Sequence, residues 1–314
     1  MAKNDPLEGK LVVLIGGSGY LGTHVAQALL ERGARLRIAS RNPEKAFKLK
    51  PLANLGQIQF ARCNVKSVES IAAVMHGTDA AAYMVGAFKG DLGALQADGA
   101  GIAARVAKTT GVKAFTYVSA IGADAESPAA YARTKAQGEE QVLKAFPKAT
   151  ILRPSVLFGE DDNFINMFAG MIAALPVLPI FGADAKLQPL WIDDAAEALA
   201  SALADPAKHG GKTYELAGPD VLTMGEINRR IAEAEGRGRA FIELPDAISG
   251  LIAALPGTPI NSDQWNLLKS GSVASGKLPG IDKFGISPKP LSLFLERWML
   301  RYRKHGRFSA KAAA

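Results

Sequence analysis

The stretch Leu11-Val-Val-Leu-Ile15 followed by Gly16-Gly-Ser-Gly19-Tyr-Leu-Gly22 decides how this chain is expected to fold. The five apolar residues are typical of a buried strand, and glycines at 16, 19 and 22 permit a tight turn and close main-chain approaches. Apolar residues from Leu21 to Leu29 recur at helical spacing, and Gly33 follows where a helix would end. The stretch therefore predicts a strand, a glycine turn and a helix whose N-terminus can bind the pyrophosphate of a dinucleotide.

The residues after the second expected strand, Leu36-Arg-Ile-Ala39, indicate which nicotinamide nucleotide is preferred. An Asp or Glu at this point would accept hydrogen bonds from the ribose hydroxyls of NADH, but the chain has Ser40-Arg41-Asn42. Arg41 places a fixed cation with forked donors where a 2′-phosphate would lie, and Lys45 and Lys48 add positive charge. We therefore expect NADPH; the alternative is that Arg41 is one solvated charge on a basic chain.

Strands and helices alternate along the first half of the chain. Further strands are expected at 58–60, 80–85, 115–118 and 150–153, and helices near 67–76, 94–110 and 131–145. This alternation predicts an α/β fold, a doubly wound parallel sheet of the Rossmann type with its ligand beyond the carboxyl ends of the strands. Residues 1–160 are expected to form this core, with a return of the chain near 185–217.

The remainder, 161–314, is expected to form a smaller, irregular and mostly helical cap, because prolines become frequent and the strands short. Its longest apolar region, Met167 to Phe181, contains Pro176 and Pro179 and is interpreted as a helix ending in a bent loop. No transmembrane span is expected. The single cysteine, Cys63, excludes an internal disulfide, and no metal site is expected. The polar start of the chain predicts neither a signal nor a transit peptide.

The net charge of +7 is concentrated at the C-terminus. Seven lysines and arginines lie from Lys289 onward against one acid, Glu296, so this segment carries +6. Apolar residues at helical spacing within it, Leu291, Phe294, Leu295, Trp298 and Tyr302, predict a basic amphipathic helix. Such a helix contacts anionic lipid or an acidic protein face, or it packs on its own domain. Nucleic acid is not expected as a partner, because the tail has no nucleic-acid recognition motif and the main body is nearly neutral.

Tyr131-Ala-Arg-Thr-Lys135 carries the possible chemistry. Residues four apart lie on one face of a helix, so the Lys135 ammonium is expected to hold the nucleotide ribose and to lower the pKa of the Tyr131 phenol toward proton transfer. The position of the motif, one segment after the fifth strand of a nucleotide-binding sheet, makes this interpretation specific.

With these motifs in order, the chain resembles the extended, atypical short-chain dehydrogenases, and more narrowly the NADPH-binding accessory subunits of respiratory complex I. The broader resemblance rests on the glycine turn, Tyr117-Val-Ser119, Tyr131 with Lys135, Arg153-Pro-Ser-Val-Leu-Phe-Gly159 and Trp191-Ile-Asp-Asp194. The narrower one adds Val118-Ser-Ala-Ile-Gly-Ala123, Phe158-Gly-Glu-Asp-Asp-Asn-Phe164 and Phe284-Gly-Ile-Ser-Pro-Lys-Pro-Leu291. It covers nearly the whole chain.

The resemblance implies bound NADPH, complex I subunits as partners, and a peripheral position on the cytoplasmic side of a bacterial inner membrane, or the matrix side in mitochondria. Together with the strand-end rule it gives the expected nucleotide contacts: Gly16, Gly19, Tyr20, Leu21, Gly22, Ser40, Arg41, Asn64, Val65, Val85, Gly86, Ser119, Tyr131, Lys135, Pro154 and Val156. Tyr131, Lys135 and Ser119 are the candidate catalytic residues.

Two classes of function remain open. Active relatives place a Ser or Thr just after the fifth strand, and the resemblance puts Ala120 at that position, with Ser119 or Ser127 as possible substitutes. This favours an accessory subunit that binds NADPH for structure or regulation, with little or no turnover. The alternative is an NADP-dependent reductase or epimerase acting on an apolar substrate, with Gly86 to Phe88, Phe158 and the region 167–178 lining its pocket.

Overall fold

The computed structural model describes residues 5–255 and 260–304, which divide into two compact units. Of the described residues, the first unit comprises 5–154, 192–216 and 275–287, and the second comprises 155–191, 217–255, 260–274 and 288–304. Each unit has its own hydrophobic core. Arg307 and Lys311 of the basic tail lie outside the described residues.

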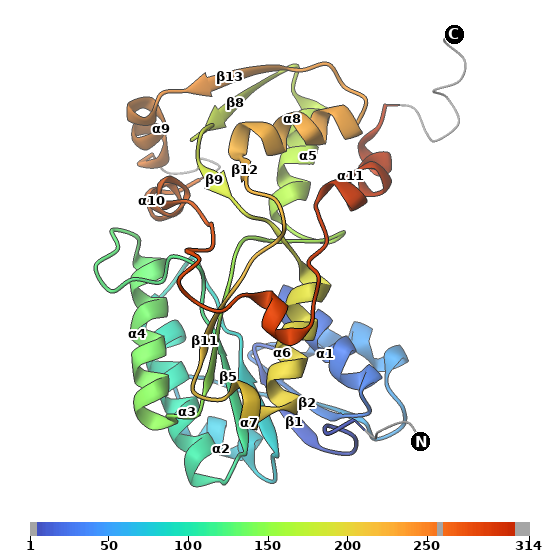
Figure 1. Cartoon of the computed structure of the whole chain (residues 1–314), viewed down its shortest axis with the longest axis vertical. Coiled ribbons are helices and arrows are strands. Elements are labelled where there is room, and N and C mark those ends of the chain that lie inside the picture. Colours follow the sequence, from blue (N-terminus) through green and yellow to red (C-terminus); the bar gives the residue numbers. More distant parts are fainter. Residues whose placement is uncertain (1–4, 256–259, 305–314) are drawn as a thin grey trace. The chain divides into compact units, whose positions relative to one another are not determined.

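The first unit is built on a seven-stranded sheet in the order β11-β6-β5-β4-β1-β2-β3, with every neighbouring pair parallel (Figure 1). The strands are β1 (Leu11–Ile15), β2 (Arg35–Ser40), β3 (Ile58–Arg62), β4 (Ala80–Tyr83), β5 (Ala114–Val118), β6 (Thr150–Pro154) and β11 (Thr213–Leu216). The central strands are apolar and buried, as a sheet covered on both faces requires. The predicted doubly wound fold is confirmed.

Helices of the first unit form two layers. Helices α2 (Val68–Met75), α3 (Gly99–Thr109) and α4 (Ala130–Ala145) pack in a row, whereas α1 (Tyr20–Glu31) packs against α6 (Ile192–Ala204) (Figure 1). Short helices complete the unit: η1 (Pro43–Leu52), α7 (Pro206–His209) and η3 (Ile281–Phe284).

The helix expected over 94–110 begins with a π-helical segment, η2 (Gly93–Asp98), before α3. Two buried phenols explain the widened turn, because the Tyr83 hydroxyl donates to Leu95 O and the Tyr117 hydroxyl donates to Gln96 O at 2.9 Å. A π-helical turn exposes main-chain carbonyls that side chains can then satisfy. The hydrophobic pattern alone does not reveal this exchange.

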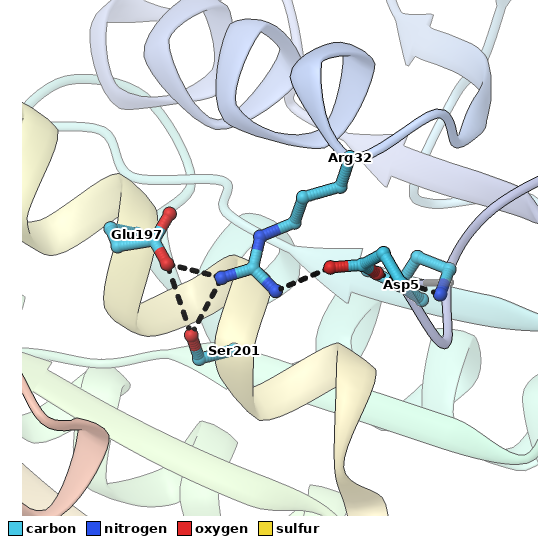
Figure 2. Close-up of polar contacts among 5 residues, drawn as sticks. Asp5, Arg32, Glu197 and Ser201 are labelled. Atoms are coloured by element: carbon cyan, nitrogen blue, oxygen red, sulfur yellow. Dashed lines mark hydrogen bonds and ion pairs between the residues drawn. The ribbon is translucent and has the colours of Figure 1, made fainter. Parts of the chain in front are cut away.

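Arg32, at the C-terminus of α1, joins three segments of the first unit. Its guanidinium donates to Asp5 at 3.3 Å, to Ser201 at 2.9 Å and to the carboxylate of Glu197 (Figure 2). Two turns earlier in α1, the His24 ring lies 2.5 Å from the Asp193 carboxylate. Both contacts connect α1 to α6, so the returning chain is fixed to the helix that follows the glycine turn.

The second unit contains α5 (Phe164–Ala174), α8 (Met224–Ala234), α9 (Asp246–Ala253) and α10 (Ser262–Ser270). Its described strands form pairs: β7 (Leu157–Phe158) with β10 (Leu190–Trp191), β9 (Lys186–Leu187) with β12 (Leu222–Thr223), and β8 (Val177–Phe181) with β13 (Ala240–Leu244). The bent loop expected after Pro176 was wrong, because Val177–Phe181 is a strand. Pro179 is tolerated there because a two-stranded sheet leaves one edge of each strand unpaired.

The C-terminal segment forms α11 (Ser292–Trp298) and η4 (Met299–Tyr302), and its apolar stripe is internal. Leu291, Leu295, Trp298 and Met299 are buried in the core of the second unit. Arg301 donates to Glu160 O, and Arg303 donates to Ala234 O at 2.9 Å. The stripe is therefore not a surface for attachment, and of the two expectations for this helix the structure favours packing on its own unit.

None of the described helices is both long and apolar enough to cross a membrane.

Candidate functional site

The glycine turn between β1 and α1 leaves little room for a side chain at Gly16, Gly17 or Gly22. Gly16 has φ +86°, and a Cβ at Gly22 would lie 2.6 Å from the Cα of Gly17. A Cβ at Gly17 would itself lie 2.8 Å from the Leu14 Cβ. Strand, turn and helix are thus in main-chain contact, which is the arrangement that brings a helix N-terminus close to a pyrophosphate.

The first turn of α1 is suited to an anion. Gly19 is its N-cap and provides no side-chain cap, and the turn carries no acidic residue. The leading N–H groups of a helix have no partner within the helix, and the helix dipole places partial positive charge there. Tyr20 and Leu21 of this turn are partly buried, and Tyr20 packs edge-to-face on His24 with ring centroids 5.5 Å apart.

Residues 40–42 at the end of β2 include Arg41 and no carboxylate, and the first acid after them is Glu44 in η1. Arg41 is exposed, and the oxygen of the preceding Ser40 hydroxyl is buried without a hydrogen-bond partner in the described part of the chain. The Asn64 side-chain oxygen accepts a hydrogen bond from Lys66 N at 3.1 Å, whereas the Val65 side chain is buried in the core. Only the main chain of Val65 is thus able to reach a nucleotide.

Lys135 connects α4 to the ends of two strands. Its Nζ donates to Val118 O, at the end of β5, at 2.8 Å and to Val85 O, just after β4, at 3.1 Å. A Cβ at Gly86 would lie 3.7 Å from the Tyr131 hydroxyl and 4.0 Å from Lys135 Nζ, so Gly86 faces both side chains. The structure therefore brings Val85, Gly86, Tyr131 and Lys135 together, at the edge of the sheet that also holds the glycine turn.

The expected effect of Lys135 on the phenol was wrong. Burial raises the pKa of Tyr131 to about 12, and burial also lowers the pKa of Lys135 to about 7, although the carboxylate of Glu139 opposes this second shift. An ammonium with two of its three N–H groups on carbonyl oxygens, and which loses charge through desolvation, contributes little to stabilising a phenolate. Arg153 holds Glu139 through two hydrogen bonds of 2.8 and 2.6 Å.

The remaining predicted residues fall into different surroundings. The Ser119 hydroxyl is buried and has no hydrogen-bond partner among the described residues, and Pro154 O accepts a bond from Ile121 N. The Ser127 hydroxyl accepts from Ala129 N at 3.2 Å, so it is engaged in the loop before α4. Val156 belongs to the second unit, where its carbonyl accepts from Leu190 N.

Phe158, expected to line a substrate pocket, is fully buried in the second unit, where Phe294 and Trp298 pack around it. It belongs to the core and does not line a pocket. Among the described residues, no group of three or more His, Cys, Asp or Glu could hold a metal ion.

Comparison with known proteins agrees with this geometry. Residues 8–261 match the NmrA-like family. The chain belongs to the NmrA-like family. This family assignment covers the glycine turn, the basic strand end and the Tyr131–Lys135 pair.

Several relatives of this NmrA-like chain are respiratory proteins. It is 29% identical to the mitochondrial NADH dehydrogenase (ubiquinone) 1 alpha subcomplex subunit 9 of Arabidopsis thaliana, covering 96% of this chain and 80% of that one. The corresponding subunit of Rattus norvegicus is 27% identical, with 95% and 82% covered. The fold matches the structure of an NADPH-dependent quinone oxidoreductase of Escherichia coli complexed with NADPH, at a TM-score of 0.74 and 21% identity, covering 91% and 99%.

Sequence reasoning missed two residues near this site, Gly17 and Arg62, and assigned a third, Phe88, a different role. Gly17 had no predicted role, but Leu14 and Ile38 leave it no room for a side chain. Arg62 lies beside Arg41 through strand pairing, which its distance along the chain conceals. Phe88, expected at a pocket wall, stacks on the Tyr131 ring with centroids 4.6 Å apart and an interplanar angle of 16°. Its position just after the fourth strand, where ligands of this fold bind, could have indicated that Phe88 lies beside Tyr131.

Proposed function

We propose that this chain binds NADPH in the first unit and serves as a nucleotide-binding accessory subunit of respiratory complex I, with little or no turnover. The observation that carries the nucleotide part is the close main-chain approach of Gly22 to Gly17 at the N-terminus of α1, together with Arg41 at the end of β2, where residues 40–42 include no acid. The assignment to complex I is supported by similarity to alpha subcomplex subunit 9 over four-fifths of that subunit's length.

Different residues of the first unit bind different parts of the nucleotide. The glycine turn and the first N–H groups of α1 hold the pyrophosphate, and Arg41 holds the 2′-phosphate. Lys135, kept in place by Val85 O and Val118 O, retains a third donor position for a ribose hydroxyl, and Tyr131 offers its hydroxyl beside it. Bound NADPH would supply a hydride donor at this site.

The same residues are poorly arranged for proton transfer. A general acid works best with a pKa near the working pH, whereas burial raises the pKa of Tyr131 to about 12. Ala120 stands where active relatives carry a hydroxyl, and Ser127 is engaged with Ala129 N. Tyr131 and Lys135 therefore act as ribose ligands, and the nucleotide stabilises the fold of the subunit.

One observation favours a second candidate function, an NADP-dependent reductase or epimerase. The Ser119 hydroxyl has no hydrogen-bond partner among the described residues, so it keeps a donor that would polarise a substrate oxygen once the buried hydroxyl is uncovered. Phe88, half-exposed and stacked on Tyr131, would then favour a flat apolar substrate.

As a subunit, the protein takes a peripheral position on the cytoplasmic side of a bacterial inner membrane, or on the matrix side if mitochondrial. Other complex I subunits are its partners. Direct contact with anionic lipid through the apolar stripe at Leu291, Leu295 and Trp298 is not proposed, because those side chains are buried in the second unit.

The test is whether bound NADPH stays reduced. Purified protein is saturated with NADPH, freed of excess nucleotide and incubated with panels of quinones, aldehydes and ketones while reduced nicotinamide is followed by absorbance. We expect no oxidation above the rate of free NADPH, and the same result for Tyr131→Phe. Oxidation that depends on both Tyr131 and Ser119 would establish the second candidate instead.

A further inference from the structure

Two arginines stand at the ends of adjacent strands in the first unit, although 21 positions separate them in the sequence. Arg41 directly follows β2, and Arg62 is the last residue of β3, in register with Ser40. Arg62 Nε donates a hydrogen bond of 3.3 Å to Arg41 O. This bond directs the Arg62 side chain across the end of β2 and leaves the two terminal nitrogens of its guanidinium for other partners.

Neither guanidinium is neutralised within the described part of the chain. Arg32, Arg153 and Arg229 each form an ion pair with a carboxylate, whereas no ion pair is formed by Arg41 or Arg62 in residues 5–255 and 260–304. Cations at neighbouring strand ends repel each other, and an anion bound by both adds attractions that outweigh this repulsion. The ends of β2 and β3 are therefore suited to binding an anion that carries more than one negative charge.

We propose that Arg62 is a second determinant of nucleotide specificity, binding the 2′-phosphate of NADPH together with Arg41. The inference rests on the proposed function, because it assumes that the glycine turn holds the nucleotide. An adenosine 2′-phosphate carries close to two negative charges at neutral pH, which matches two guanidinium groups, and each guanidinium can donate two parallel hydrogen bonds to phosphate oxygens. In η1, which follows, the exposed Glu44 and Lys45 offset each other in charge, so the proposal rests on the two arginines.

The two arginines have separable roles. Arg41 is part of the chain segment that turns away from β2, so its position follows from the main chain. Arg62 comes from a neighbouring strand and is positioned by its bond to Arg41 O. The loss of Arg62 is therefore expected to weaken recognition of the phosphate without changing the main-chain path at the ribose.

Isothermal titration calorimetry with NADPH, NADH and 2′,5′-ADP tests this proposal on the wild type, Arg41→Gln, Arg62→Gln and the matched control Arg35→Gln. Arg35 is exposed at the opposite, amino end of β2. We expect Arg62→Gln to weaken binding of NADPH and of 2′,5′-ADP by about tenfold or more, with NADH affinity unchanged. Arg35→Gln should change none of the three.

The outcomes distinguish this inference from the function on which it rests. A wild type that prefers NADPH, and that loses the preference in Arg41→Gln but keeps it in Arg62→Gln, would overturn only the role of Arg62. Equal weakening of NADH and NADPH by Arg62→Gln would overturn it too, because the residue would then act on the fold. A wild type without preference for NADPH would overturn both proposals.

Discussion

The Nζ of Lys135 lies 2.8 Å from the carbonyl oxygen of Val118, so a side chain of α4 closes the carboxyl end of β5. This contact joins the helix that carries the Tyr131–Lys135 pair to the sheet that carries the glycine turn. It also explains why Lys135 is almost completely buried, at 1% exposure, without an ion pair of its own in the described residues. Hydrogen bonds to main-chain oxygens take the place of a carboxylate.

Burial of Lys135 gives the stability of the protein a defined pH dependence. The pKa of Lys135 falls from 10.5 to about 7 on folding, so between these values the unfolded chain binds a proton that the folded chain lacks. Stability therefore rises with pH across this window, and the full cost of burying the ammonium is present below it. In urea unfolding, the free energy of unfolding of the wild type should rise relative to that of Lys135→Met by roughly 1.4 kcal/mol per pH unit within the window. Parallel profiles would contradict the shift.

The Tyr131 phenol should remain protonated well above neutral pH. Burial raises its pKa to about 12, and Lys135 does not counter this because its ammonium is itself desolvated. Subtracting the ultraviolet titration of Tyr131→Phe from that of the wild type isolates the phenolate signal of this residue. We expect none below about pH 11. A phenolate signal near neutrality would instead indicate a tyrosine prepared for catalysis.

Gly22→Ala should destabilise the protein because its methyl group would lie 2.6 Å from the Cα of Gly17, where neither main chain can move freely. We expect the free energy of unfolding to fall by about 1–3 kcal/mol, and NADPH affinity to fall with it. Gly170→Ala in α5 is the matched control, since a Cβ there meets nothing within 4 Å. That variant should gain up to about 1 kcal/mol through helix propensity. Equal effects of the two substitutions would show that close packing at Gly22 is not required.

Helix α11 offers a matched pair of leucines that separates a structural role from an attachment role. Leu295 is 4% exposed in the core of the second unit, whereas Leu293 is 64% exposed. Leu295→Ala should lower the free energy of unfolding by about 2–5 kcal/mol, and Leu293→Ala should change it by less than about 0.5 kcal/mol. If Leu295→Ala leaves thermal unfolding unchanged, this stripe does not belong to the core.

The first βαβ segment could be predicted closely because local rules determine it. Apolar strands, glycines at 16, 19 and 22, and Gly33 after the helix are all visible in one short stretch, and β1 and α1 lie where the pattern indicates. The lack of an acid among residues 40–42, directly after β2, is equally visible in the sequence. The need for glycine at position 17 is not visible in the motif, because it comes from close contacts with Leu14 and Ile38.

Features that depend on contacts between residues far apart in the sequence could not be predicted in the same way. Arg62 meets Arg41 only through the parallel pairing of β2 with β3, and the π-helical turn of η2 depends on hydroxyls from β4 and β5. The amphipathic pattern of 291–302 was correctly seen, but periodicity does not say whether an apolar face meets lipid, a partner or its own core. The pKa values of Tyr131 and Lys135 depend on burial, which spacing along a helix does not reveal.

The central claim is that this chain holds NADPH within respiratory complex I, and one purification tests it directly. An affinity-tagged copy is expressed in its native host, the membranes are solubilised in mild detergent, and the captured material is assayed for complex I subunits and for extracted nucleotide. We expect stoichiometric recovery of complex I with one NADPH per tagged chain, and loss of this nucleotide in the Gly22→Ala variant. Recovery of the tagged chain alone, or of complex I with the chain present but without NADPH, would contradict it.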